Sequence, residues 1–68
     1  MKFIIESEQE EDGLWLAEVL ELPGVMVYGK TRQEALAKAQ ALALRVIAER
    51  LEHGEMLVEP LNILFAAA

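Results

Sequence analysis

The sequence predicts a small α+β domain with the element order β-β-β-α-β, in which an antiparallel sheet carries one helix packed on one face. Three observations support this. Residues 2–28 contain three short β-rich stretches separated by turn signals. Residues 31–53 run without Gly or Pro and place apolar side chains at helical spacing. The chain has 68 residues, which is enough for one domain, so residues 1–68 are treated as a single unit.

The first two strands are expected over residues 2–8 and 14–20. The turn between them, residues 9–13, ends in Asp12-Gly13, a pair that tolerates a positive φ. A Leu-Pro-Gly turn at residues 22–24 ends the second strand. The three strands are therefore expected to form a meander with short connections.

A short third strand over residues 25–28 is closed by Gly29, and a helix follows. Thr31 and Glu34 have the spacing of a capping box, in which each side chain binds an amide of the first turn. The predicted buried stripe contains Leu36, Ala39, Ala43, Ile47 and Leu51, with Val46 beside it, and the opposite face contains Lys38, Arg45, Glu49 and Glu52. The two alanines in the stripe favour a close approach of helix and sheet, and Gly54 is a suitable C-terminal stop.

The last element is expected to be extended chain over residues 56–65. Pro60 cannot donate a hydrogen bond to a neighbouring strand, so it belongs at the start of a strand or at an edge. Residues 66–68 are expected to be a frayed end.

The predicted strands have apolar side chains on both faces. In the second strand Trp15, Ala17 and Val19 point one way, and Leu14, Leu16 and Leu20 point the other. One helix covers one face, so we expect another copy or a partner to bury the second face. Which face meets the helix stays open; as the oligomer interface the sequence predicts Leu14, Leu16, Leu20, Met26 and Tyr28. A chain this short without cysteine also needs support beyond its own core, which favours oligomers.

The formal net charge of −6 lies entirely in the first third of the chain. Residues 1–21 hold seven acidic side chains and one basic one, and the remainder is balanced. Such a chain repels phosphate, so direct binding of nucleic acid is not expected. The acidic turn is either a solvated loop that keeps the protein in solution or a docking surface for a basic protein. The candidate partner-binding residues are Glu10, Glu11, Asp12, Glu18 and Glu21.

No catalytic or metal-binding constellation is recognisable in the sequence. His53 is the single histidine and has no companion ligand, and the spacing of Glu10, Glu11 and Asp12 lacks the alternation of a calcium loop. We therefore expect no enzyme activity and no cofactor. Neither a leader pattern nor a membrane-spanning stretch is recognised, so the expected location is the cytoplasm.

An ordered set of motifs resembles the HicB antitoxin-like family. The matching residues are Asp12, Gly13, Leu14, Trp15, Leu16, Ala17, Glu18 and Val19, then Leu22, Pro23 and Gly24, then Gly29, Lys30 and Thr31, then Glu34, Ala35 and Leu36. The resemblance implies a fold similar to part of the ribonuclease H fold, without its acidic active site. It also implies homo-oligomers that sequester HicA, a small basic toxin that cleaves mRNA. Within the family, this chain resembles the short members that have no C-terminal DNA-binding domain.

Two functional hypotheses follow. The first is an antitoxin-type module that occludes the active surface of a small basic ribonuclease toxin. The second is a solitary oligomeric module with a structural or small-ligand role and no toxin partner.

Overall fold

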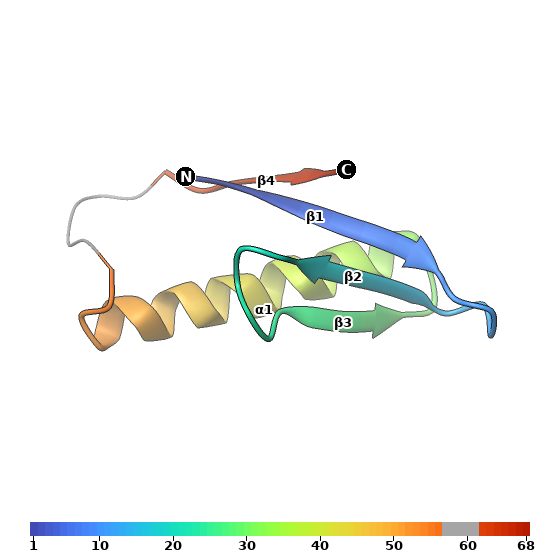
Figure 1. Ribbon diagram of the computed structural model, residues 1–68, viewed down its shortest axis with the longest axis horizontal. Helices are drawn as coiled ribbons and strands as arrows, with labels where there is room; N and C mark the ends of the chain where they lie inside the picture. Colours follow the sequence, from blue (N-terminus) through green and yellow to red (C-terminus); the bar gives the residue numbers. More distant parts are fainter. Residues whose placement is uncertain (57–61) are drawn as a thin grey trace.

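The computed structural model describes residues 1–56 and 62–68, and its elements follow the predicted order. They are β1 (Lys2–Gln9), β2 (Trp15–Val19), β3 (Met26–Gly29), α1 (Arg32–Glu52) and β4 (Leu64–Ala67). Four strands form one sheet, and the helix lies against it (Figure 1). The predicted α+β class and the β-β-β-α-β order are therefore confirmed.

The sheet is mixed, whereas the sequence predicted an antiparallel one. The strand order is β3-β2-β1-β4, with antiparallel pairing from β3 to β1 and parallel pairing between β1 and β4. The cause is the length of α1, whose 21 residues span about 31 Å at roughly 1.5 Å per residue. The helix thus returns the chain to the end of the sheet where β1 begins, and the amide of Leu64 donates to the carbonyl of Met1 at 2.9 Å.

The last strand begins later and ends later than predicted. Residues 57–61 of the expected extended segment, with Pro60, lie outside the described residues. Residues 66 and 67, predicted to be frayed, belong to β4 and pair with Ile4 and Ile5 of β1. The aromatic ring of Phe65 stacks on that of Phe3 with centroids 5.8 Å apart, which gives this strand an apolar anchor.

The helix begins where the capping pattern predicted. Thr31 is the N-cap, and its hydroxyl accepts a hydrogen bond from the amide of Glu34 at 3.0 Å. The Glu34 carboxylate pairs with the ammonium of Lys38 at 3.1 Å. The cap is thus confirmed on the threonine side, while the glutamate binds one turn further along the helix.

Small side chains dominate the buried face of α1, which consists of Ala35, Ala39, Ala43 and Ile47. The predicted alanines are confirmed there. Leu36 and Val46 are half-buried beside the stripe, and Leu51, predicted to be buried, is exposed. Leu51 lies in the last turn of α1, where the helix extends beyond β2 and β3 (Figure 1).

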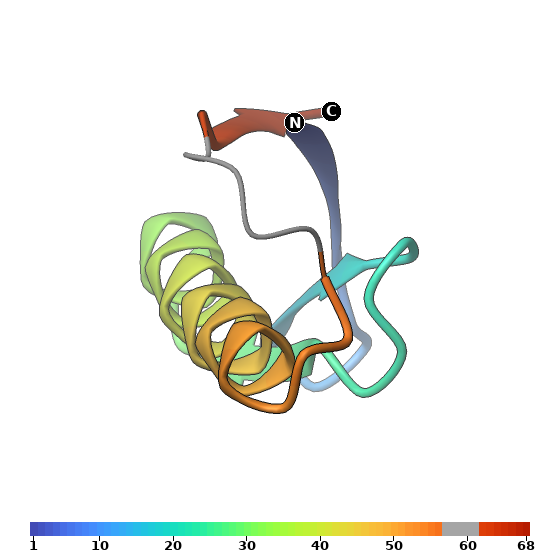
Figure 2. The same ribbon diagram turned by 90° about the vertical axis from the view of Figure 1, so that its left-hand side faces the viewer.

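The core lies between α1 and one face of the sheet, as Figure 2 shows. The strand residues of this core are Phe3, Ile5, Ala17 and Val19, and they are joined by Leu22 and Val25 from the connection before β3. Trp15 and Val27 are half-buried on the same side. Of the two apolar faces that the sequence left undecided, the one with Trp15, Ala17 and Val19 therefore meets the helix.

Candidate protein-binding surface

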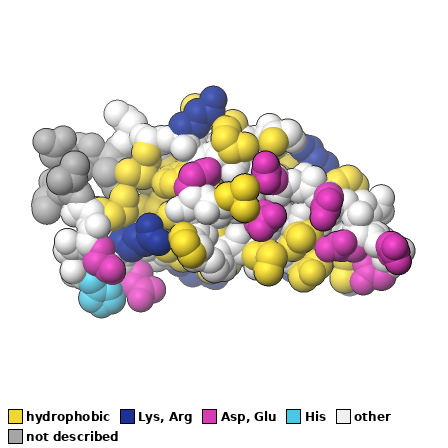
Figure 3. All heavy atoms as spheres, in the orientation of Figure 1, with side chains coloured by type: hydrophobic (Ala, Val, Ile, Leu, Met, Phe, Trp, Pro, Cys, Tyr) yellow, Lys and Arg dark blue, Asp and Glu magenta, His cyan; other side chains and the backbone are white. Residues whose placement is uncertain are grey.

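The sheet face opposite α1 carries both carboxylates and exposed apolar side chains. We call it the open face. Strand alternation and the observed register assign to it Lys2, Ile4, Glu6, Glu8, Leu16, Glu18, Met26, Tyr28 and Leu64. The large side chains of Met26 and Tyr28 are 56% and 50% exposed, which is high for residues within a sheet. Acidic and hydrophobic side chains are interspersed across this view of the molecule (Figure 3).

Cross-strand pairing arranges the open face in two mixed rows. In one row Leu16 lies between Glu8 of β1 and Tyr28 of β3. In the next, Glu18 lies between Glu6 and Met26. Each row therefore changes from acidic to apolar as it crosses the sheet from β1 to β3.

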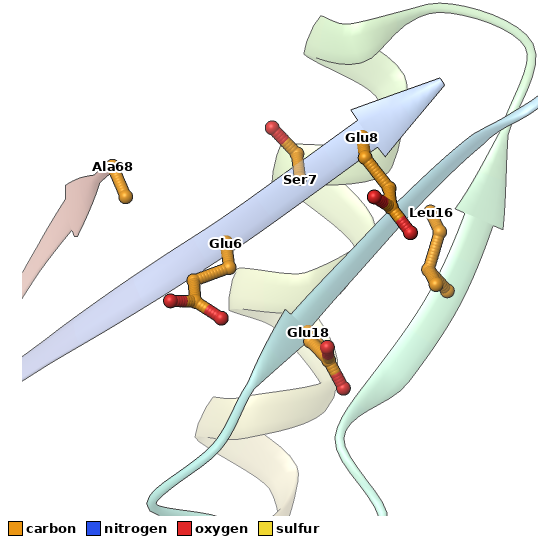
Figure 4. Close-up of a pocket in the computed structure, with 6 residues that line it drawn as sticks. All are labelled: Glu6, Ser7, Glu8, Leu16, Glu18 and Ala68. Atoms are coloured by element: carbon orange, nitrogen blue, oxygen red, sulfur yellow. The ribbon is translucent and has the colours of Figure 1, made fainter. Parts of the chain in front are cut away.

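Glu6 and Glu18 are direct partners in the β1–β2 ladder. Like charges directly opposite each other destabilise a sheet, because the two side chains begin only about 4.5–5.5 Å apart. Figure 4 shows the carboxylates of Glu6, Glu8 and Glu18 on the same side of the sheet, with α1 behind it. Together with Leu16 they line a hollow of about 390 Å³.

Within residues 1–56 and 62–68, no basic side chain forms an ion pair with these carboxylates. The ion pair that occurs there joins Lys38 to Glu34 on the helix. The Lys38 ammonium holds the pKa of Glu34 below its usual value, with a further contribution from a backbone hydrogen bond at Lys30. The open face therefore keeps its negative charge available to a partner.

The predicted acidic turn adjoins the open face at one corner. Glu10, Glu11 and Asp12 lie between β1 and β2, and together with Leu14 and Tyr28 they line a second hollow. Asp12 also has a local role, because its carboxylate accepts a hydrogen bond from the amide of Leu14 at 3.0 Å. The turn extends the negative surface past the end of the strands.

The other residues predicted for partner binding or oligomer contacts lie partly on the open face and partly outside it. Glu18 lies in the middle of the open face, whereas Glu21 is an exposed residue of the β2–β3 connection and lines neither hollow. The predicted interface residues Leu14, Leu16, Leu20, Met26 and Tyr28 fall on the open face or at its ends, and Leu20 is 63% exposed. Whether another chain covers them stays a prediction.

The sequence prediction missed Glu6 and Glu8. Both alternate along β1 with the buried Phe3 and Ile5, so they share a face with Ile4. That alternation was present in the sequence, but assigning it to the uncovered side of the sheet required knowing where the helix lies.

Two kinds of feature are absent from the part of the chain that the structure describes. There, no group of three or more His, Asp or Glu side chains is arranged to hold a metal ion. None of the helices in those residues combines the length and apolar character that a bilayer crossing requires.

Comparisons with protein-family models, with curated proteins and with solved structures find no match for this chain. The resemblance to the HicB antitoxin-like family therefore depends on the motif residues alone.

Proposed function

We propose that this chain is an antitoxin-type binding module whose open face sequesters a small basic ribonuclease toxin of HicA type. The observation that carries the proposal is the set of Glu6, Glu8 and Glu18, which lie among exposed apolar side chains on the face opposite α1. Two of these glutamates are cross-strand partners, and in the described residues neither forms an ion pair with a basic side chain. A sequence that keeps a locally unfavourable arrangement is expected to do so at a functional site.

The mechanism needs no chemistry from this chain. A ribonuclease must present cationic side chains to bind the phosphates of RNA. The same cations are attracted to a patch of carboxylates, so the open face competes with RNA for the toxin's active surface. Burial of Leu16, Met26 and Tyr28 against the toxin adds affinity, since aromatic and apolar side chains dominate the energetics of protein interfaces.

The proposal includes the cytoplasm as the place of action, because that is where a toxin meets mRNA. It also includes self-association, which the resemblance implies for the family. Neither an enzymatic step nor a cofactor belongs to the proposed function.

The test is an inhibition assay with a HicA-type toxin encoded in the same genome. The purified toxin cleaves a labelled RNA, and the chain is added in increasing amounts. We expect inhibition that is complete near an equimolar ratio. Full RNA cleavage in the presence of excess chain would contradict the proposal.

Two charge-reversed variants locate the contact. The first carries Glu6→Lys, Glu8→Lys and Glu18→Lys on the open face, and we expect it to lose inhibition. The second carries Glu49→Lys and Glu52→Lys at exposed positions of α1, on the other side of the sheet, and serves as the control with inhibition retained. Equal inhibition by the open-face variant and the unaltered chain would remove the electrostatic basis of the proposal.

A second candidate function is a solitary oligomeric module with a structural or small-ligand role. It is favoured by the exposure of Leu20, Met26, Tyr28 and Leu64, which an assembly would bury. Light scattering on the pure chain together with the toxin assay separates the two candidates. A stable assembly that leaves the toxin active supports the second.

A further inference from the structure

One edge of the sheet lacks the features that usually prevent pairing between sheets. β4 is an edge strand, and residues 62–68 contain no charged side chain and no proline. Natural edge strands are commonly protected by lysine, proline, a bulge or a covering segment. At the opposite edge Lys38 donates a hydrogen bond to the carbonyl of Tyr28 at 3.4 Å, which occupies a backbone acceptor of β3. Within the described residues, β4 has no comparable cover.

The backbone of β4 presents hydrogen-bonding groups on its outer side. The amides of Leu64 and Ala68 point toward β1, because they donate to Met1 and Ile5 at 2.9 and 3.0 Å. Successive residues of a strand direct their amide and carbonyl groups to opposite sides. The amide and carbonyl groups of Phe65 and Ala67 therefore point away from the sheet, where a further strand could bind them.

The distribution of charged side chains favours β4 over the open face as the contact between two copies. The open face carries Glu6, Glu8 and Glu18, and stacking two copies there would bring six carboxylates into one interface. The side chains of β4 are uncharged and two of them are alanines, so no charged side chain of this strand opposes the approach of a copy of the same strand. Antiparallel pairing of identical strands also satisfies the two-fold symmetry that most homodimers adopt.

We propose that β4 pairs antiparallel with β4 of a second copy of this chain, with Ala66 on the two-fold axis. In this register Phe65 of each copy exchanges backbone hydrogen bonds with Ala67 of the other copy. Ala66 lies opposite its counterpart at the close, non-bonded spacing of about 4.5 Å between Cα atoms, which suits a methyl side chain. The result is one continuous sheet through both copies.

This register also extends the apolar layer on the helix side of the sheet. Phe65 is half-buried and stacks on Phe3. In the dimer the two Phe65 rings become diagonal neighbours across the new strand pair, a separation that aromatic side chains can bridge. The two-fold axis is perpendicular to the sheet, so both helices cover the same face and both open faces remain available on the other. Self-association and the proposed toxin contact therefore use different surfaces, and this inference does not depend on the proposed function.

The first measurement is the mass of the pure chain in solution over a range of concentrations, combined with amide exchange. We expect a species of about twice the 7.6 kDa of one chain. Slow exchange at the amides of Phe65 and Ala67 is expected in the same samples, since only a paired edge protects them. A chain that stays monomeric at all concentrations up to about 1 mM overturns the proposal, because its dimer would then have a dissociation constant above about 1 mM, which is very weak binding. So does a dimer in which these two amides exchange freely.

A charge-exchange experiment tests the register and does not depend on one variant folding well. Ala66→Lys places two like charges beside the axis, and Ala66→Glu does the same with the opposite sign. Each variant alone is expected to be monomeric, and an equal mixture is expected to recover the dimer mass as a heterodimer. The backbone amide of residue 66 points toward β1, so neither side chain removes a hydrogen bond of the sheet.

Met26→Lys on the opposite edge is the matched control, because Met26 is an exposed open-face residue of an edge strand. It is expected to leave the dimer unchanged. A dimer that survives Ala66→Lys but dissociates with Met26→Lys would assign self-association to another surface and refute the β4 contact.

Discussion

Gly29 shows how a single residue sets the distance between β3 and the helix. A Cβ atom at this position would lie 2.5 Å from the backbone nitrogen of Ala35 and 2.9 Å from its Cα. Its φ is not in the left-handed region, so the requirement is for space. Ala35 itself is fully buried, and the pair forms the tight junction between sheet and helix.

Gly29→Ala is therefore expected to lower the free energy of unfolding by about 1–3 kcal/mol, the range for overpacking a tight contact. Urea denaturation followed by the fluorescence of Trp15 measures the change. Gly13→Asn is the control: a Cβ atom at Gly13 would have no neighbour within 4 Å, and the φ there is +91°, a sign of φ that Asn tolerates better than most residues. A larger loss in the control than in Gly29→Ala would contradict the contact argument.

Glu34, next to Ala35 in the chain, makes a pH-dependent contribution to the stability of the fold. Its pKa is lowered below the ordinary value of 4.5, first by the Lys38 ammonium and then by the backbone at Lys30. A lowered folded-state pKa means that the stabilisation is complete above the unfolded-state value and disappears as the pH falls through the folded-state value.

At neutral pH the Glu34→Gln variant is thus expected to have a lower Tm than the unaltered chain. In acid this difference should disappear. Thermal scans at a series of pH values on both chains test this. Thr31→Ala is the companion change; it removes the cap and is expected to destabilise the helix by about 1 kcal/mol at all pH values. A Glu34→Gln difference that persists below the folded-state pKa would show that the carboxylate does not act through its charge.

At the scale of elements, the helix approaches the sheet on a row of small side chains. Ala35, Ala39 and Ala43 are each 0% exposed. Such a row allows a short distance between the two layers, because no side chain longer than a methyl group separates them.

Ala39→Leu is expected to destabilise the fold by about 1–3 kcal/mol, since the added atoms have no space between helix and sheet. Ala41→Leu is the matched control. It makes the same replacement at an exposed position of the same helix, so the change in helix propensity is the same in both variants. Chemical denaturation of the two variants measures the difference. Equal stabilities would mean that the layers can move apart freely.

In the β1–β2 ladder, Glu18 affects both the stability of the sheet and the toxin binding that we propose. Glu18→Lys replaces the like-charge pair with Glu6 by an opposite-charge pair and should stabilise the chain by about 0.2–1 kcal/mol. The same change is expected to weaken the toxin binding that we propose, because it removes one carboxylate from the open face and adds a cation. Thermal denaturation and the inhibition assay together test both effects. A variant that becomes less stable would contradict the repulsion inferred for this pair.

At the scale of the whole molecule, the protein is elongated and its charge is concentrated. Its radius of gyration is 12.8 Å and its extents are 41 × 19 × 16 Å. A compact chain of this length is expected to have a radius of about 11 Å. The helix that extends past β2 and β3 contributes to the shape, and the charge of −6 lies mainly on β1, β2 and the turn between them.

This charge distribution predicts that salt stabilises the fold. Raising NaCl from about 0.01 M to about 0.5 M shortens the screening length from about 30 Å to under 10 Å and weakens the repulsion among the carboxylates. The Tm should rise accordingly. In a chain with Glu6→Gln and Glu18→Gln the rise is expected to be smaller, and an equal rise would place the repulsion elsewhere in the molecule.

Local patterns in the sequence were sufficient for most elements. The turn at Asp12-Gly13, the cap at Thr31 and the period of the helical stripe each depend on residues within a few positions of one another, and the structure confirms all three. The extent of the final strand was not predictable in this way. Residues 66 and 67 have weak strand preference, and they are in β4 because they pair with β1 at the other end of the chain.

By itself, therefore, the sequence determined the order of the elements and the helix boundaries. Its prediction of two apolar sheet faces is correct for the helix side, whereas the opposite face also carries Glu6, Glu8 and Glu18. Only the tertiary structure decided that β4 runs parallel to β1 and that Glu6 and Glu8 join Glu18 on the uncovered face. Both outcomes depend on where α1 packs, since the helix fixes which side of the sheet is closed and to which end the chain returns. That placement follows from contacts between residues far apart in the chain, which no local pattern encodes.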